Sequence, residues 1–191
     1  MKKKHLSFSL LLLLTFNLSS FCQEVEKTFV PYIMIDGKIE NFERATSKME
    51  SKAIGFGYGG ANTYLTIFNS KNSPVRFKSS DLPKFIIQLD KGTDPLDLVV
   101  ISKADVVKKR KTYRRFVQQG VNGFGGGAKD MSNYFTIPKL KKIKENLYEM
   151  VFEKPFEPGE YSFLPIYKGI EAGNIMTTSN GFRIYCFGID E

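Results

Sequence analysis

Histidine is almost missing from this sequence, since His5 is the single histidine among 191 residues. His5 lies in an N-terminal segment that we expect to be removed on export. The remaining chain would then offer no imidazole for Ser-His-Asp or Cys-His catalysis, or for histidine-ligated zinc. Carboxylates, lysines, tyrosines and hydroxyls are present, but no motif places them together. The sequence therefore predicts no catalytic residue, no metal site and no cofactor.

Cysteine and tryptophan are equally scarce, with two cysteines (Cys22 and Cys186) and no tryptophan. If residues 1–22 are removed, only Cys186 is left, so no internal disulfide can form even in an oxidising compartment. Cys186 lies in the apolar run FRIYCFG, where we expect it to fill the core as a small hydrophobic residue. The absence of tryptophan disfavours a sugar site built on indole stacking, although tyrosine and phenylalanine can take that role.

The N-terminus has the form of an export signal. Lysines at positions 2–4 precede an apolar stretch with five consecutive leucines, and this stretch is too short to span a bilayer. Small residues at its end predict cleavage after Cys22, which leaves a periplasmic or secreted chain of residues 23–191 without a transmembrane helix. The alternative is a lipoprotein anchored through Cys22, which Phe21 disfavours because lipoprotein signals place a small residue there.

Short β-branched and aromatic runs alternate with turn residues along the mature chain. Residues 62–69 (NTYLTIFN) show the period-two alternation of a strand with one buried face. We therefore predict a single all-β domain, an antiparallel β-sandwich that is immunoglobulin-like in general architecture, with at most one or two short helices. One helix is expected over residues 39–53, where Phe42, Ala45 and Met49 have helical spacing. Seventeen phenylalanines and nine tyrosines can supply a large core.

Two C-terminal segments carry a resemblance to other proteins. Residues 158–163 (PGEYSF) and 182–190 (FRIYCFGID) are similar to the closing strands of uncharacterised exported bacterial proteins. Residues 55–60 (GFGYGG), 73–77 and 84–86 are similar as well, so the resemblance extends over most of the mature chain. It implies an all-β fold and no known activity, and it carries no catalytic residue to this sequence.

Glycines gather in two places. Residues 55–60 match the glycine spacing of dinucleotide-binding loops, but such loops follow a strand and open a helix. The expected order here is the reverse, so we predict a glycine-rich hairpin turn or bulge. The second tract lacks the lysine of a phosphate-binding loop. It predicts a mobile surface loop that contains Gly120, Gly123, Gly125, Gly126 and Gly127.

Positive charge is concentrated in the middle of the chain. Residues 102–144 hold twelve basic and two acidic residues, whereas residues 145–191 hold three basic and eight acidic ones. Such a block can attract anionic lipid, polysaccharide or an acidic protein, and nucleic acid is not expected in an exported setting. The candidate contacts are Lys108, Lys109, Arg110, Lys111, Arg114, Arg115, Lys139, Lys141 and Lys142.

Two arrangements of this basic block are open. Acidic residues of 145–153 could neutralise it across neighbouring strands, or residues 106–118 could form a long edge strand whose cations face solvent. The leading hypothesis is an exported, non-enzymatic binding or structural protein of the cell envelope that contacts an anionic partner through residues 104–144. The alternative, a carboxylate-based glycan-active enzyme, requires a concave site with two carboxylates about 5–10 Å apart.

Overall fold

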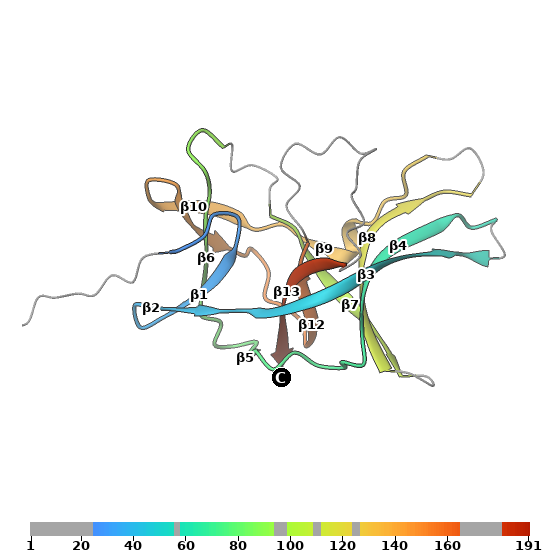
Figure 1. Cartoon of the computed structure of the whole chain (residues 1–191), viewed down its shortest axis with the longest axis horizontal. Helices are drawn as coiled ribbons and strands as arrows, with labels where there is room; N and C mark the ends of the chain where they lie inside the picture. Colours follow the sequence, from blue (N-terminus) through green and yellow to red (C-terminus); the bar gives the residue numbers. More distant parts are fainter. Residues whose placement is uncertain (1–24, 56–57, 94–98, 109–111, 124–126, 165–180) are drawn as a thin grey trace, which may run out of the picture.

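The computed structural model describes residues 25–55, 58–93, 99–108, 112–123, 127–164 and 181–191 (Figure 1). The predicted signal, with His5 and Cys22, lies outside these ranges. The described chain is built from thirteen strands and contains a short 3-10 helix, η2 (Ser132–Tyr134). This architecture confirms the predicted all-β class. Within the described ranges, no helix has the length and apolar character needed to cross a membrane.

The smaller sheet has five antiparallel strands in the order β10-β11-β6-β1-β2. A tight turn at Asp36 and Gly37, both with positive φ, joins its first two strands, as the twist of a short hairpin requires. The edge strands are β10 and β2. The bounds are β1 (Pro31–Ile35), β2 (Lys38–Asn41), β6 (Lys84–Gln88), β10 (Lys139–Lys144) and β11 (Leu147–Val151).

The larger sheet closes on itself as a six-stranded barrel, because β12 pairs with both β13 and β7. The cyclic order is β12-β13-β3-β4-β8-β7, and two short strands, β5 and β9, pair with β13 and β7 from outside. The immunoglobulin-like sandwich is therefore not confirmed. The bounds are β3 (Glu43–Ala53), β4 (Ala61–Phe68), β5 (Arg76–Lys78), β7 (Ile101–Lys108), β8 (Thr112–Val121), β9 (Phe135–Thr136), β12 (Gly159–Phe163) and β13 (Phe182–Asp190).

The helix expected over residues 39–53 is wrong, because this segment forms most of β2 and all of β3. Its burial alternates with a period of two: Ala45 and Ser47 are buried, and Thr46 between them is exposed. Strand β3 pairs with β13 through residues 43–47 and with β4 through residues 48–53. Phe42 lies between β2 and β3 and enters the core, so its helical spacing from Ala45 is coincidental.

An aromatic core joins the smaller sheet to one wall of the barrel. Phe85 of β6 and Phe187 of β13 are fully buried, and their ring centroids lie 5.2 Å apart in an edge-to-face arrangement. Phe42 lies 4.9 Å from both Phe85 and Phe163. Such rings contribute both buried area and edge-to-face attraction. A second core inside the barrel contains Ala45, Leu65, Ile67, Phe116, Ile184 and Cys186.

Candidate anion-binding surface and neighbouring clefts

The basic residues of 104–118 lie on a hairpin of two strands, β7 and β8, and the single long edge strand expected over 106–118 is wrong. Strand β7 ends at Lys108 and β8 begins at Thr112. The side chain of Lys108, together with the candidate contacts Lys109, Arg110 and Lys111, lies outside the described part of the chain. Strand β8 is an inner strand of the barrel because it pairs with β4 as well as β7.

Arg114 of β8 points into the barrel, and its side chain is fully buried. Its Nη2 donates to both carboxylate oxygens of Glu43 at 2.7 and 2.9 Å, and its Nη1 donates to Oε2 of Glu160 at 3.1 Å. Burial opposes the charge, but hydrogen bonding to Glu43 and nearby charges raise the pKa of the guanidinium. A buried cation requires such partners. Arg114 is therefore an internal cation and not a contact for a partner.

Glu160 connects Arg114 to a second arginine, Arg76 of β5. Oε1 of Glu160 accepts a hydrogen bond of 2.6 Å from Nη1 of Arg76. The Nε and Nη2 atoms of Arg76 donate to Asp190 at 3.0 and 2.6 Å, and this bonding lowers the pKa of Asp190. A chain of alternating charges thus runs from Glu43 inside the barrel to the half-exposed Asp190. We call these five residues the internal ion chain: Glu43, Arg114, Glu160, Arg76 and Asp190.

The loop before β5 closes the end of the barrel over the internal ion chain. The backbone N–H of Ser73 donates to Oε2 of Glu160 at 2.7 Å, and that of Gly188 donates to the carbonyl of Val75 at 2.8 Å. Gly188 leaves room for Arg76, since a Cβ there would lie 2.3 Å from Nη1 of Arg76. Residues of three sequence segments, 73–77, 158–163 and 182–190, meet at this point and include members of an internal salt-bridge network.

Cys186 is buried beside this network. Burial raises the pKa of its thiol to about 12. At neutral pH the thiol therefore stays protonated, and a nucleophile needs the thiolate form. This environment agrees with the expected role of Cys186 as a small core residue.

Arg115 faces the outside of the barrel but is also paired. Its Nη2 donates to Oδ2 of Asp105 on the neighbouring strand at 3.1 Å. Its guanidinium also lies 4.6 Å from the ring centroid of Tyr64, within the range of cation–π attraction. Both described arginines of β8 therefore have partners within the chain.

Among the described residues of 104–144, the exposed basic side chains lie on strand β10. Lys139 is bonded to the carboxylate of Glu153. The other three lysines of the strand are exposed, and no carboxylate of the described residues forms an ion pair with them: Lys141, Lys142 and Lys144. Lys144 is not among the nine predicted contacts. Lys141 faces Glu149 across the β10–β11 ladder without an ion pair between the side chains. Cross-strand neutralisation by the acidic segment is therefore partial.

The two glycine-rich segments pack against each other. Ala53 pairs with Ala61, so the GFGYGG segment occupies the turn of the β3–β4 hairpin, as expected. A Cβ at Gly60 would lie 1.9 Å from the carbonyl oxygen of Val121, and one at Gly123 would lie 1.9 Å from that of Tyr58.

This packing corrects part of the predicted mobile loop. Gly120 is a buried residue of β8, and a Cβ there would lie 2.8 Å from the sulfur of Met131. Gly123 lies in the contact just described. The carbonyl of Gly127 accepts a hydrogen bond of 2.8 Å from the N–H of Asn122. Gly125 and Gly126 lie outside the described residues.

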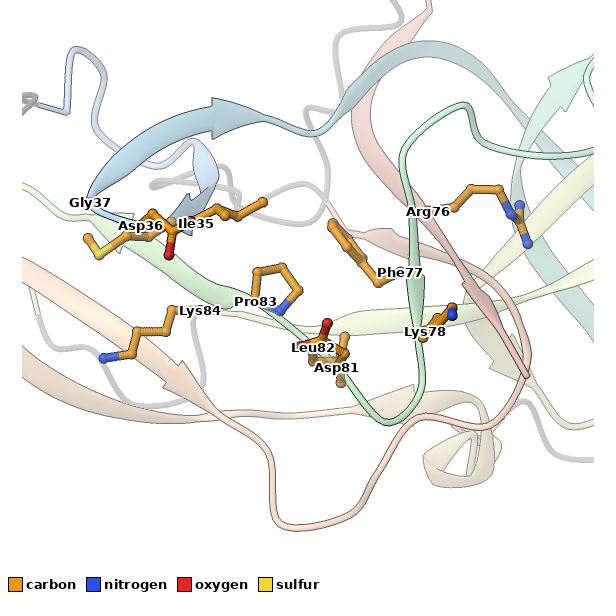
Figure 2. Close-up of a pocket in the computed structure, with 11 residues that line it drawn as sticks. Ile35, Asp36, Gly37, Arg76, Phe77, Lys78, Asp81, Leu82, Pro83 and Lys84 are labelled. Atoms are coloured by element: carbon orange, nitrogen blue, oxygen red, sulfur yellow. The ribbon is translucent and has the colours of Figure 1, made fainter.

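A cavity of about 740 Å³ lies between the β1–β2 turn, β5 and the start of β6 (Figure 2). Its wall combines apolar side chains such as Phe77 and Pro83 with the charged residues Lys78, Lys84, Asp36 and Asp81. In Figure 2 the guanidinium of Arg76 points away from this wall, in agreement with its bonds inside the ion chain. Both aspartates are exposed, whereas a general acid of a glycosidase needs a desolvated carboxyl.

A second cavity, of about 370 Å³, lies between η2, β9 and residues 153–157. We call it the Tyr134 cleft. Two of its acids are bonded to lysines: Glu157 to Lys103 at 2.6 Å, and Glu153 to Lys139. These hydrogen bonds lower the pKa values of both carboxyls. A lowered pKa is the reverse of what a general acid requires at neutral pH.

Comparisons with protein-family models, with curated proteins and with solved structures gave no match. Within the described ranges, no group of three or more histidine, cysteine, aspartate or glutamate side chains is placed to hold a metal ion. The functional argument therefore depends on the positions and partners of the charged and aromatic side chains.

Proposed function

We propose that this protein is an exported, non-enzymatic binding protein of the cell envelope that contacts an anionic partner through β10. The supporting observation is that Lys141, Lys142 and Lys144 are exposed on an edge strand without ion-pair partners among the described residues. Figure 1 shows β10 at the outer side of the smaller sheet. The arginines of β8, in contrast, bond to carboxylates of the chain. Among the described basic residues of 104–144, the proposed contact is thereby narrowed to β10.

Charge spacing favours a partner with repeated negative charges. The three lysines lie within four residues of one strand, a span of about 10 Å. This span is comparable with the screening length of about 8 Å at physiological ionic strength, so their potentials partly overlap. An anionic lipid surface, a polysaccharide or an acidic protein can meet several of them at once. A row of lysines can also protect an edge strand from pairing with another chain, and this protective role requires no partner.

Export is supported by the sequence features of residues 1–22. Periplasmic or secreted localisation follows from cleavage, and attachment as a lipoprotein through Cys22 is the alternative. Intact mass of the mature protein separates the two, because a lipidated Cys22 would add the mass of its acyl chains.

A non-enzymatic role is supported by the state of the acids that line the two cavities. Asp36 and Asp81 are exposed in the larger cavity. In the Tyr134 cleft, Glu153 and Glu157 are bonded to lysines. All four carboxyls are exposed, whereas carboxylate-based glycoside hydrolysis uses a desolvated acid beside a second carboxylate.

The test is retention of the mature protein on polygalacturonate beads and on phosphatidylglycerol vesicles. We expect the variant K141Q/K142Q/K144Q to lose retention and the wild type to lose it as salt is added, because exposed charges are screened. The matched control removes the same charge from three exposed lysines elsewhere, Lys38, Lys48 and Lys71, and should keep retention. Equal loss in both variants, or loss in neither, would contradict a binding role for β10.

A further inference from the structure

We infer that the Tyr134 cleft binds an acidic sugar unit, so that the anionic partner of β10 is a polysaccharide. This inference rests on the proposed function and identifies the class of partner. The cleft and β10 form one continuous surface, because Glu153 of the cleft is bonded to Lys139, the first residue of β10. A polymer that occupies the cleft would therefore continue along the lysines of β10.

The cleft presents apolar surface within a polar rim. Tyr134 is 39% exposed and Ile137 is 58% exposed, and both line the cleft. A tyrosine ring with an accessible face can pack against the C–H face of a sugar, while its hydroxyl reaches polar groups. Phosphate headgroups and extended acidic peptides offer no such ring-shaped apolar face. The aromatic surface therefore favours a saccharide among the anionic partners.

The floor of the cleft is rigid. Phe156 and Tyr161 are buried, and their ring centroids lie 4.8 Å apart in an edge-to-face arrangement. The hydroxyl of Tyr161 donates to the carbonyl of Glu157 at 2.7 Å, and Nζ of Lys103 lies 6.0 Å from the Tyr161 ring centroid. A site that is ordered before binding loses less entropy when the ligand arrives.

The local sequence also fixes the position of Tyr134. Asp130 accepts a hydrogen bond of 2.9 Å from the N–H of Ser132 through its side chain, which starts the turn into η2. The N–H of Tyr134 donates to the carbonyl of Met131 at 2.9 Å. Met131 is buried and anchors this turn to the barrel. The exposed ring thus projects from a short, well-bonded segment.

The charges of the cleft favour an acidic sugar over a neutral one. Lys103 and Lys139 are bonded to Glu157 and Glu153, but Lys154 forms no ion pair with a carboxylate of the described residues. Lys154 and Asn133 both line the cleft. An ammonium group can pair with the carboxylate of a uronic acid unit, and the amide can bond to its hydroxyls. Together with Tyr134, these groups match the chemistry of such a unit.

The experiment is calorimetric titration of the mature protein with a short oligogalacturonate. We expect Tyr134→Ala and Lys154→Gln each to weaken binding by about tenfold, the scale of one stacking or charged contact. Tyr134→Phe keeps the ring and should retain most of the affinity. Tyr58→Ala, which removes a tyrosine that is 73% exposed on the β3–β4 turn, is the matched control and should bind as the wild type does.

Inorganic polyphosphate carries negative charge but no sugar rings. It therefore distinguishes sugar binding by the Tyr134 cleft from anion binding by β10. Tyr134→Ala should leave polyphosphate binding unchanged, whereas K141Q/K142Q/K144Q should weaken the binding of both polymers. If Tyr134→Ala binds oligogalacturonate like the wild type while the lysine variant does not, the cleft inference is overturned and the role of β10 stands. If the lysine variant binds both polymers like the wild type, the proposed function itself is overturned.

Discussion

Arg114 and Lys142 belong to the same basic stretch of sequence, yet their environments are opposite. Arg114 is fully buried between carboxylates of Glu43 and Glu160, whereas Lys142 is exposed on an edge strand and has no ion-pair partner among the described residues. The difference follows from strand position. An inner barrel strand directs every second side chain inward, while the last strand of an open sheet leaves its charges to solvent.

This contrast shows that local charge density does not identify a binding surface. The carboxylates that bond to Arg114 come from positions 71 and 46 residues away in the chain. A short stretch of sequence around Arg114 therefore does not contain them. Basic side chains that are paired inside the fold can be distinguished from those that can contact another molecule only when their ion-pair partners are known. The following predictions test this division, from the largest expected effect to the smallest.

Replacing Arg114 by methionine keeps most of the apolar stem but leaves Glu43 and Glu160 without their buried cation. We expect the free energy of unfolding to fall by about 3–5 kcal/mol, the usual cost of breaking a buried ion pair. Urea denaturation measures this change. Arg115→Met is the control, because the partly exposed pair with Asp105 should contribute only about 0–1 kcal/mol. Similar small losses in both variants would refute the structural role of Arg114.

Substitution of Gly188 by alanine tests the packing of the internal ion chain. The added Cβ would lie 2.3 Å from Nη1 of Arg76, so the guanidinium must move away from Glu160. We expect a loss of about 1–3 kcal/mol, typical of overpacking, in the same urea experiment. Gly127→Ala is the matched control, because the nearest atom to its Cβ would be 3.9 Å away. Equal stabilities of the two variants would argue against close packing around Arg76.

Substitution of Asp190 should have the smallest effect on stability, because its side chain is 52% exposed. Its pKa is lowered by hydrogen bonding to Arg76. A lowered folded-state pKa adds stability above the unfolded value, near pH 4, and that stability is lost as pH falls through the folded value. Melting temperatures between about pH 7 and 3 should therefore decline less steeply in Asp190→Asn than in the wild type. Asp36→Asn is the control and should follow the wild type. Identical slopes of melting temperature against pH in all three proteins would contradict a stabilising ion pair between Asp190 and Arg76.

Local patterns in the sequence were sufficient to predict the all-β class and the turn at residues 55–60. Alternation in 62–69 and a glycine cluster between two runs are properties of neighbouring residues. The strand at 43–53 was missed because Phe42, Ala45 and Met49 also satisfy helical spacing. The closure of the barrel was missed because it requires β7 to pair with β12, and these strands are distant in the chain.

The candidate site was predictable only in part. Charge alone predicts lysines 139, 141 and 142 as contacts, and their position on the edge strand β10 requires the sheet order. Burial of Arg114 could not be deduced from the sequence, although a charged residue such as Glu160 in a strand that is mostly buried requires a partner of opposite charge. The Tyr134 cleft was missed because its two walls come from separate segments.

The most direct test of the division between internal and available charge is lysine acetylation, read by mass spectrometry with and without polygalacturonate. We expect the polymer to protect Lys141, Lys142 and Lys144, because these lysines are exposed on β10 without ion-pair partners in the described chain. Three exposed lysines away from β10 and the Tyr134 cleft, Lys38, Lys48 and Lys71, should react equally in both conditions. Protection spread evenly over both sets, or absent from β10, would contradict the assignment of β10 as the contact surface.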